Sequence, residues 1–143
     1  MDTDADVMAE LLRQVENGHV AWINGDCGPY EFSDETSTIM GAFGGVTVGA
    51  TAATPGQRRA VAQFVSGSGT VELINSGVSG NVAWLVMIER ARVRFVGHDQ
   101  DCRWDLRATE VFERRNDQWI RVHRHADPLV DRHPLAELLT LLP

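Results

Sequence analysis

Two histidines and an aspartate stand at alternating positions near the end of the chain, in the stretch RVHRHADPLV. Side chains of a β-strand alternate between its two faces, so His123, His125 and Asp127 would share one face. An imidazole titrates near neutral pH and a carboxylate can fix its tautomer, which together permit general acid/base catalysis. The same set facing water would need no functional explanation, so alternation alone leaves both interpretations open.

A fourth candidate is Glu110, which interrupts an otherwise apolar strand face. The other members of that face are Trp104, Leu106, Ala108 and Phe112. A carboxylate in this position either reaches water or lies in a pocket that has a use for it. The turn residues Asn116-Asp117 join this strand to the next, so we expect Glu110 within cross-strand reach of His123 or His125.

A metal site is a further alternative. His123 and His125 with Glu110 or Asp127 could bind a metal ion, because a strand projects alternate residues to one side. The spacing fixes no third ligand, however, so we expect neither a metal nor another cofactor.

The elements that must position these residues are predicted from periodicity and turn signals. Residues 4–24 carry apolar side chains at three-and-four spacing, which is typical of an amphipathic helix. The sequence then indicates a short helix starting at Pro29, two short strands around Gly44-Gly45, a second helix over 54–67, and β-rich runs over 70–80, 81–95, 102–115 and 118–127. Helices followed by a curved antiparallel sheet predict the α+β class.

The composition limits the kind of protein. A chain of 143 residues fits one domain over 1–143, with a helical tail over 131–143. The net charge of −7 and the scattered arginines argue against a nucleic-acid partner, and no apolar run is long enough to cross a membrane. Cys27 and Cys102 have no metal or redox spacing. We expect a cytoplasmic protein, although a disulfide between the two cysteines stays open.

Several local patterns together resemble one known superfamily. They are the first helix ending in WINGD, the proline-started helix, the hairpin, the second helix and the strands finishing in RATEVFERRNDQWIRVHRHAD. From about Val7 to Asp127 the chain resembles the nuclear transport factor 2-like (NTF2-like), or cystatin-like, superfamily, in its SnoaL-like and ketosteroid-isomerase-like branch. The resemblance implies a cone-shaped sheet that wraps the first helix around a deep apolar pocket. Many members are dimers through the outer sheet face.

The resemblance also implies roles for single residues. Glu110 falls at the position of the isomerase's oxyanion-binding acid, which is kept neutral by an apolar site. The implied pocket positions are Trp22, Tyr30, Met40, Trp84, Val86, Ile88, Ala108 and Phe112, together with His123, His125 and Asp127. The chain departs from the isomerase pattern where Met40 replaces the catalytic base and Gly18 replaces a helix tyrosine. Steroid isomerisation by that mechanism is therefore not expected.

Two functions fit these observations. The first is a pocket for a small, largely apolar metabolite, with acid/base chemistry of the isomerase, cyclase, dehydratase or hydrolase type. In it, His123 or His125 is the general base, Glu110 is the acid or orients the base, and Asp127 holds a tautomer. The second is a non-catalytic ligand-binding or dimerisation module in which the histidines are structural.

Overall fold

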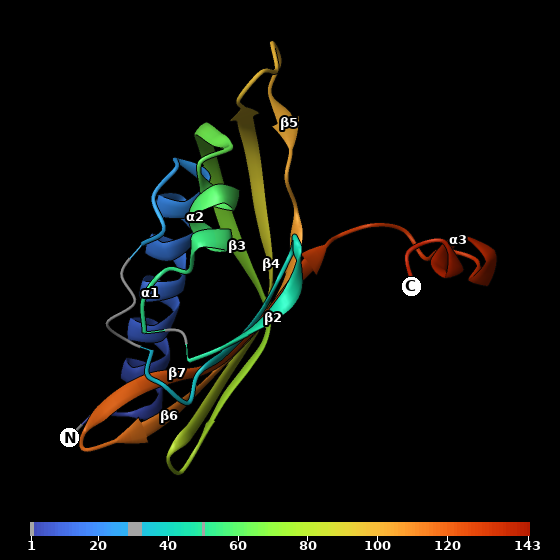
Figure 1. Cartoon of the computed structure of the whole chain (residues 1–143). Coiled ribbons are helices and arrows are strands. Elements are labelled where there is room, and N and C mark those ends of the chain that lie inside the picture. The colour runs from blue at the N-terminus through green and yellow to red at the C-terminus, as the bar shows by residue number, and fades with distance from the viewer. Residues whose placement is uncertain (1, 29–32, 50) are drawn as a thin grey trace.

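The computed structural model of the chain describes residues 2–28, 33–49 and 51–143 (Figure 1). Its elements in chain order are α1 (Asp4–Ile23), β1 (Thr38–Gly41), β2 (Gly44–Val48), α2 (Pro55–Val61), β3 (Phe64–Ser79), β4 (Val82–Phe95), β5 (Cys102–Arg103), β6 (Leu106–Arg115), β7 (Gln118–Pro128) and α3 (Leu135–Leu139). The predicted α+β class is confirmed, with helices α1 and α2 on one side of the curved sheet (Figure 1).

Helix α1 starts at a capping box. The Thr3 hydroxyl accepts a hydrogen bond from the backbone N–H of Asp6, and the Asp6 carboxylate accepts one from the backbone N–H of Thr3. The side chains that α1 buries against the sheet are Val7, Leu11, Val15, His19 and Ile23. At the other end of α1, the Asn24 side chain exchanges two hydrogen bonds with the backbone of Gly67. Both ends of the helix are therefore fixed by specific contacts.

The sheet has the strand order β2-β1-β7-β6-β4-β3, and β5 also pairs with β4. Its neighbouring strands are antiparallel, as predicted, except that β1 runs parallel to β7. Register shifts in β3 after Phe64 and after Leu73 bend that long strand. The result is a curved, unclosed mixed sheet, whose concave side receives α1 (Figure 1).

The main core lies between α1 and the concave face of β4 and β6. Its sheet residues are Ala83, Leu85, Met87, Leu106, Ala108, Phe112 and Ala126. These side chains occupy every second position of their strands, so the opposite parity of each strand points to the convex face. This parity decides which of the predicted site residues can reach the interior.

The second helix is shorter than predicted. It covers Pro55–Val61 instead of 54–67, with Thr54 as its N-cap, and Phe64 already begins β3. Phe64, which falls within the predicted helix, is buried as a residue of the sheet. The short helix predicted to start at Pro29 lies outside the described residues.

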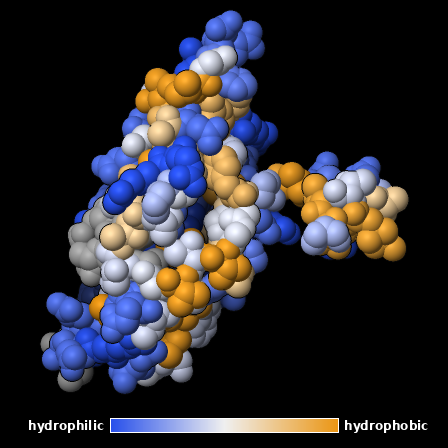
Figure 2. All heavy atoms as spheres, viewed as in Figure 1, coloured by the Kyte–Doolittle hydropathy of each residue, from blue (hydrophilic) through white to orange (hydrophobic). Residues whose placement is uncertain are grey.

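The C-terminal tail contains the expected short helix, α3, which has no buried residue. All residues from 129 to 143 are exposed, and the tail extends away from the sheet (Figure 1). Its leucines form an apolar surface on this protruding segment (Figure 2). None of the helices within 2–28, 33–49 and 51–143 combines the length and the apolar character needed to cross a bilayer.

Candidate functional site

A cavity of about 560 Å³ lies between α1, the β1–β2 hairpin and the concave face of the sheet. Its apolar lining includes Val15, Trp22, Ile23, Phe43, Trp104, Leu106, Phe112 and Ala126. Its charged lining on the sheet consists of Glu89, Glu110, Arg121 and Arg124, which we call the charged cluster. A concave site with a mostly apolar wall and a few placed polar groups is the usual form of a small-molecule site.

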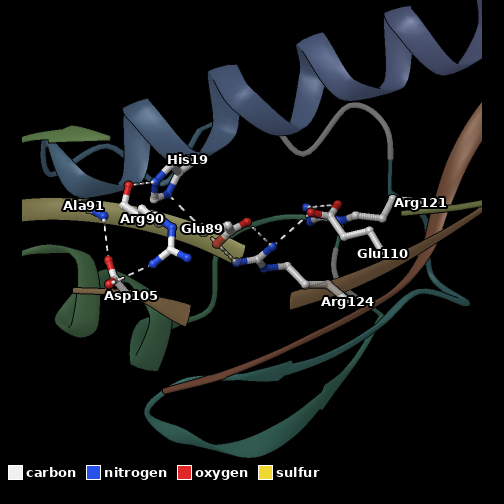
Figure 3. Close-up of polar contacts among 8 residues, drawn as sticks. All are labelled: His19, Glu89, Arg90, Ala91, Asp105, Glu110, Arg121 and Arg124. Atoms are coloured by element: carbon white, nitrogen blue, oxygen red, sulfur yellow. Dashed lines mark hydrogen bonds and ion pairs between the residues drawn. The ribbon is translucent and has the colours of Figure 1, made fainter. Parts of the chain in front are cut away.

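Arg124 is the centre of the charged cluster (Figure 3). Its two terminal nitrogens donate to both oxygens of Glu89, at 2.8 and 2.7 Å, and one of them also donates to Glu110 at 2.9 Å. The other Glu110 oxygen accepts a weaker hydrogen bond from Arg121, at 3.4 Å. The bidentate contact with Glu89 uses the planar fork of the guanidinium, which lysine could not reproduce.

The charged cluster depends on a β-bulge in β7. Arg121 and Arg124 are three residues apart, so regular alternation would place them on opposite faces of the strand. In the β6–β7 ladder, however, Phe112 pairs with Arg121 and Val111 pairs with His123, so the ladder skips Val122. The extra residue restores Arg124 to the concave face beside Arg121.

Burial differs between the acids and the bases of the charged cluster. The side chains of Glu89 and Glu110 are only 3% and 4% exposed, whereas those of Arg121 and Arg124 are 21% and 20% exposed. The carboxylates therefore lie deepest in the wall, and the guanidinium groups are the part of the cluster that the cavity can reach.

Electrostatics inside the charged cluster favour ionised groups. Burial alone would raise the pKa of Glu89, but the charge and hydrogen bonds of Arg124, with smaller contributions from His19 and Arg121, lower it below its usual value. For Arg124, burial acts to lower the pKa, and the charges of Glu89 and Glu110 more than offset this and raise it. Glu89 and Arg124 thus form a charged pair at neutral pH.

His19 ties helix α1 to the strand that carries Glu89. Its Nε2 lies 2.9 Å from the carbonyl oxygen of Arg90, so this nitrogen must carry a proton and donate, because a carbonyl only accepts. Its Nδ1 lies 3.9 Å from a Glu89 oxygen. Close approach is possible because residue 69 is glycine: a Cβ there would lie 2.6 Å from the His19 Nε2. His19 therefore has a positioning role in the wall.

Aromatic side chains form a second group at the cavity. Phe43, in the turn between β1 and β2, lies with its ring centroid 5.6 Å from that of Trp104 and 6.4 Å from that of Phe64. Trp22 on α1 reaches the same Phe64 ring at 6.2 Å. The cavity thus has one charged and one aromatic part.

Three of the predicted site residues line the cavity: Glu110, Trp22 and Phe112. Ala108 shares their face but is buried in the core. The environment of Glu110 differs from the apolar one implied by the isomerase pattern, because both of its oxygens accept hydrogen bonds from arginine. Tyr30 lies outside the described residues.

The prediction that His123, His125 and Asp127 share the face of Glu110 is wrong. They pair with Val111, Thr109 and Arg107, whose parity points to the convex side, and Glu110 pairs with Arg124. Asp127 accepts two hydrogen bonds from Arg107, at 2.7 and 2.8 Å. His123 contacts the Thr38 hydroxyl at 2.7 Å, across the parallel β1–β7 pair. His123 and Asp127 thus make their side-chain contacts on the outer face of the sheet.

The same parity argument corrects four of the predicted pocket positions. Trp84, Val86 and Ile88 alternate with the buried Ala83, Leu85 and Met87, so they lie on the convex face. Met40 pairs with His125 and is exposed, while its neighbours Ile39 and Gly41 line the cavity. The face of β4 cannot be assigned from its sequence, because both parities are apolar in its first half.

The residues that the sequence reasoning missed are Glu89, Arg121, Arg124 and Phe43. A signal for Glu89 exists: it interrupts the buried parity of β4 between Met87 and Ala91 in the same way that Glu110 interrupts β6. Two acids at buried positions require cationic partners, which points to an inward-facing arginine. The bulge that selects Arg121 and Arg124 leaves no comparable mark in the sequence.

Within the described ranges, no three His, Cys, Asp or Glu side chains gather closely enough to hold a metal ion. Cys27 and Cys102 are both free thiols, and Cys27 lines the cavity. Burial, followed by the charge of Asp26, raises the pKa of the Cys27 thiol, so it is a poor nucleophile at neutral pH.

Comparisons with known proteins identify the fold. No protein-family model and no curated protein matches the sequence. Among solved structures, a proposed dehydratase of the NTF2-like family from Streptomyces avermitilis superimposes with a TM-score of 0.72 at 15% identity, covering 90% of this chain and 100% of that one. An NTF2-like superfamily protein from Salmonella enterica gives 0.69 at 18% identity, covering 90% and 95%.

A third similar structure has a different role. The association domain of CaMKII from C. elegans superimposes with a TM-score of 0.57 at 10% identity, covering 86% of this chain and 93% of that domain. Such identities establish shared architecture and leave function open. The curved sheet that packs on α1, the cavity between them and these superpositions together show that the chain has the NTF2-like, cystatin-like fold.

Proposed function

We propose that this chain binds one small, largely apolar metabolite in the cavity beneath α1. The observation that carries the proposal is the charged cluster in the wall of a 560 Å³ cavity that is otherwise rich in aliphatic and aromatic side chains. Buried ion pairs are weak contributors to stability, because desolvation offsets much of their attraction. A buried group of four charges at a cavity wall is therefore better explained by recognition of a ligand than by folding.

A proton-transfer reaction in this cavity would use Glu110. It is the one residue of the four predicted for acid/base chemistry that lines the cavity. The shared fold with a proposed dehydratase supports catalysis on such a scaffold. Glu110→Gln keeps the shape of the side chain, so we expect it to retain ligand binding and to lose turnover of the bound ligand. Unchanged turnover in this variant would leave binding alone as the function.

Gly18 offers a direct test of binding. It lines the cavity from α1, and a Cβ added there meets no atom within 4 Å, so a larger side chain can grow into open space. The probe is N-phenyl-1-naphthylamine, a neutral apolar dye whose fluorescence rises when it leaves water. We expect saturable binding of the dye to the wild type and to Gly18→Ala, and binding at least about tenfold weaker in Gly18→Leu, which fills the cavity.

The matched pair Gly18→Ala and Gly18→Leu separates blocking from unfolding. Both replacements favour a helix relative to glycine, so neither should destabilise α1. Equal dye binding by Gly18→Leu and Gly18→Ala, with both variants folded by circular dichroism, would contradict the proposed cavity site.

A second candidate function, an oligomerisation module, is favoured by the outer surface. Trp84, Val86 and Ile88 lie together on the convex face of β4, and the tail exposes further leucines. The shared fold with a kinase association domain supports assembly through this scaffold. On this proposal the full chain is a homodimer in light scattering, and Val86→Glu on the convex face makes it monomeric without altering dye binding. A monomeric wild type would exclude this function.

A further inference from the structure

The charged cluster presents only hydrogen-bond donors to the cavity. Both Glu89 oxygens accept hydrogen bonds from Arg124, and both Glu110 oxygens accept from arginines. These carboxylates are almost completely buried, while the side chains of Arg121 and Arg124, which line the cavity, keep about a fifth of their surface exposed. A guanidinium has five N–H donors and no acceptor. A ligand therefore meets N–H groups here, and it reaches a carboxylate oxygen only where an arginine releases one.

Arg124 retains donors for a ligand. Among the described residues, three of its five N–H groups donate hydrogen bonds, all of them to Glu89 and Glu110. Its remaining donors and the guanidinium of Arg121 lie on the same face of β7, because the bulge at Val122 brings both arginines inward (Figure 3). Two adjacent guanidinium groups match the two oxygens of a carboxylate better than any neutral head group.

The rest of the wall restricts the body of the ligand beyond that head group. Outside the charged cluster, the lining includes the apolar side chains of Val15, Trp22, Ile23, Phe43 and Trp104, beside uncharged polar side chains such as Gln14, Asn17 and Gln57 and the cationic Arg13. A second charged group on the ligand would be desolvated wherever it lay against the apolar side chains, which is strongly unfavourable. A molecule with one charged end and an apolar body avoids that cost.

The local polarity is opposite to that of the whole chain. The protein has a net charge of −7, so its general field repels anions. Selection of an anion must then come from the exposed guanidinium groups at short range, where the wall excludes water and strengthens their hydrogen bonds.

We infer that the ligand of this cavity is a monocarboxylate with an aliphatic or aromatic body, whose carboxylate binds Arg121 and Arg124 and whose body lies against Trp22, Phe43 and Trp104. This inference rests on the proposed function, since it specifies the class of metabolite that the same cavity binds. An amine is excluded as the polar end by the burial of both glutamates.

The test compares three head groups on one eight-carbon body: octanoate, octan-1-ol and octylamine. Their affinities for the full chain are measured by isothermal titration calorimetry at pH 7, with Gly18→Leu as the blocked control. A charge-assisted hydrogen bond contributes about 1.5–3 kcal/mol, so octanoate should bind at least about tenfold more tightly than the other two. Gly18→Leu should abolish this binding.

Arg121→Gln tests the residue and Arg92→Gln, on the convex face, is its matched control. We expect Arg121→Gln to weaken octanoate binding by about tenfold and to leave the affinity for octan-1-ol unchanged. Arg92→Gln should change neither affinity. If Arg121→Gln does not fold, Arg121→Lys replaces it, because lysine keeps the charge but lacks the planar guanidinium. Octanoate should again bind more weakly.

The outcomes separate the two proposals. Octan-1-ol or octylamine binding as tightly as octanoate, with all of them blocked in Gly18→Leu, would overturn the carboxylate inference and support the cavity. Absence of octanoate binding in a protein that binds the neutral dye would likewise overturn the carboxylate inference and support the cavity. Failure of the dye and of all three probes would overturn both proposals.

Discussion

Glu110 lies directly opposite Arg124 in the β6–β7 ladder, although the turn joining these strands would by itself place Glu110 opposite His123. Asn116 and Asp117 both have positive φ and form a two-residue turn, from which Arg115 pairs with Gln118. Counting outward from that pair without interruption leads from Glu110 to His123. The bulge at Val122 shifts the register by one residue, which replaces the imidazole with a guanidinium.

Insertion of one alanine between His123 and Arg124 is expected to destabilise the protein strongly. The extra residue would turn Arg124 to the convex face and leave Glu89 and Glu110 buried without its charge. Loss of one partner from a buried ion pair costs about 3–5 kcal/mol in the free energy of unfolding. Deletion of Val122 is the control, because the ladder already skips this residue and Arg124 stays opposite Glu110 when it is removed. Urea titration of both variants measures the cost, and equal stability of the two would argue against a role for strand register in placing Arg124.

Arg124→Met should be among the most destabilising single substitutions, by about 3–5 kcal/mol, because both glutamates then lose their main partner. Arg92→Met, at an exposed position of the same sheet, is the control and should stay within about 0.5 kcal/mol. Adding Glu89→Gln and Glu110→Gln to Arg124→Met removes the unpaired charges, so the triple variant should regain part of the loss. Urea unfolding of the three proteins measures this, and no recovery would indicate that packing dominates.

Low pH should decrease the free energy of unfolding, because Glu89 becomes protonated. Its pKa is lower in the folded chain than the usual value of 4.5, so the folded state binds the proton less readily than the unfolded state. This stabilisation is complete above about pH 4.5 and is lost as the pH falls through the folded-state pKa. The difference in unfolding free energy between the wild type and Glu89→Gln should therefore shrink from pH 6 to pH 3 in urea titrations. A difference that stays constant with pH would contradict the assignment.

Replacement of two glycines by alanine should change the free energy of unfolding in opposite directions. At Gly18, where a Cβ meets open space inside a helix, alanine should raise the free energy of unfolding by up to about 1 kcal/mol. At Gly69, a Cβ would lie 2.5 Å from the Arg90 carbonyl oxygen and 2.6 Å from the His19 Nε2, so alanine should lower stability by about 1–3 kcal/mol. Thermal melting of both variants checks the sign, and a stable Gly69→Ala would mean that both α1 and β4 can move away from residue 69 without cost.

Removal of the tail should leave the fold intact. The residues from 131 to 143 are exposed throughout, so a chain ending at Val130 should have a free energy of unfolding within about 0.5 kcal/mol of the full chain. Urea titration checks this. A larger loss would indicate that the leucines of the tail bury surface in an assembly, and light scattering of both proteins at the same concentration would then show a change in mass.

The sequence was sufficient for most elements of the fold. Apolar spacing predicts α1, turn residues predict the β6–β7 hairpin, and β-rich runs predict β4, β6 and β7. Its local signals fail at the end of the second helix, because the predicted range 54–67 includes Phe64, which begins β3. The physical reason is that burial by a helix and burial by a sheet use the same residue types.

The sequence by itself determined that His123, His125 and Asp127 share one face of a strand and that Glu110 interrupts an apolar one. Only the tertiary structure decided that these are different faces of the sheet. Alternation does not show which face of a strand is concave. A single bulged residue exchanges the two faces for the rest of the strand, and no local sequence pattern marks that bulge. The charged cluster forms because long-range pairing of β4, β6 and β7 brings Glu89, Glu110 and Arg124 together on the concave side.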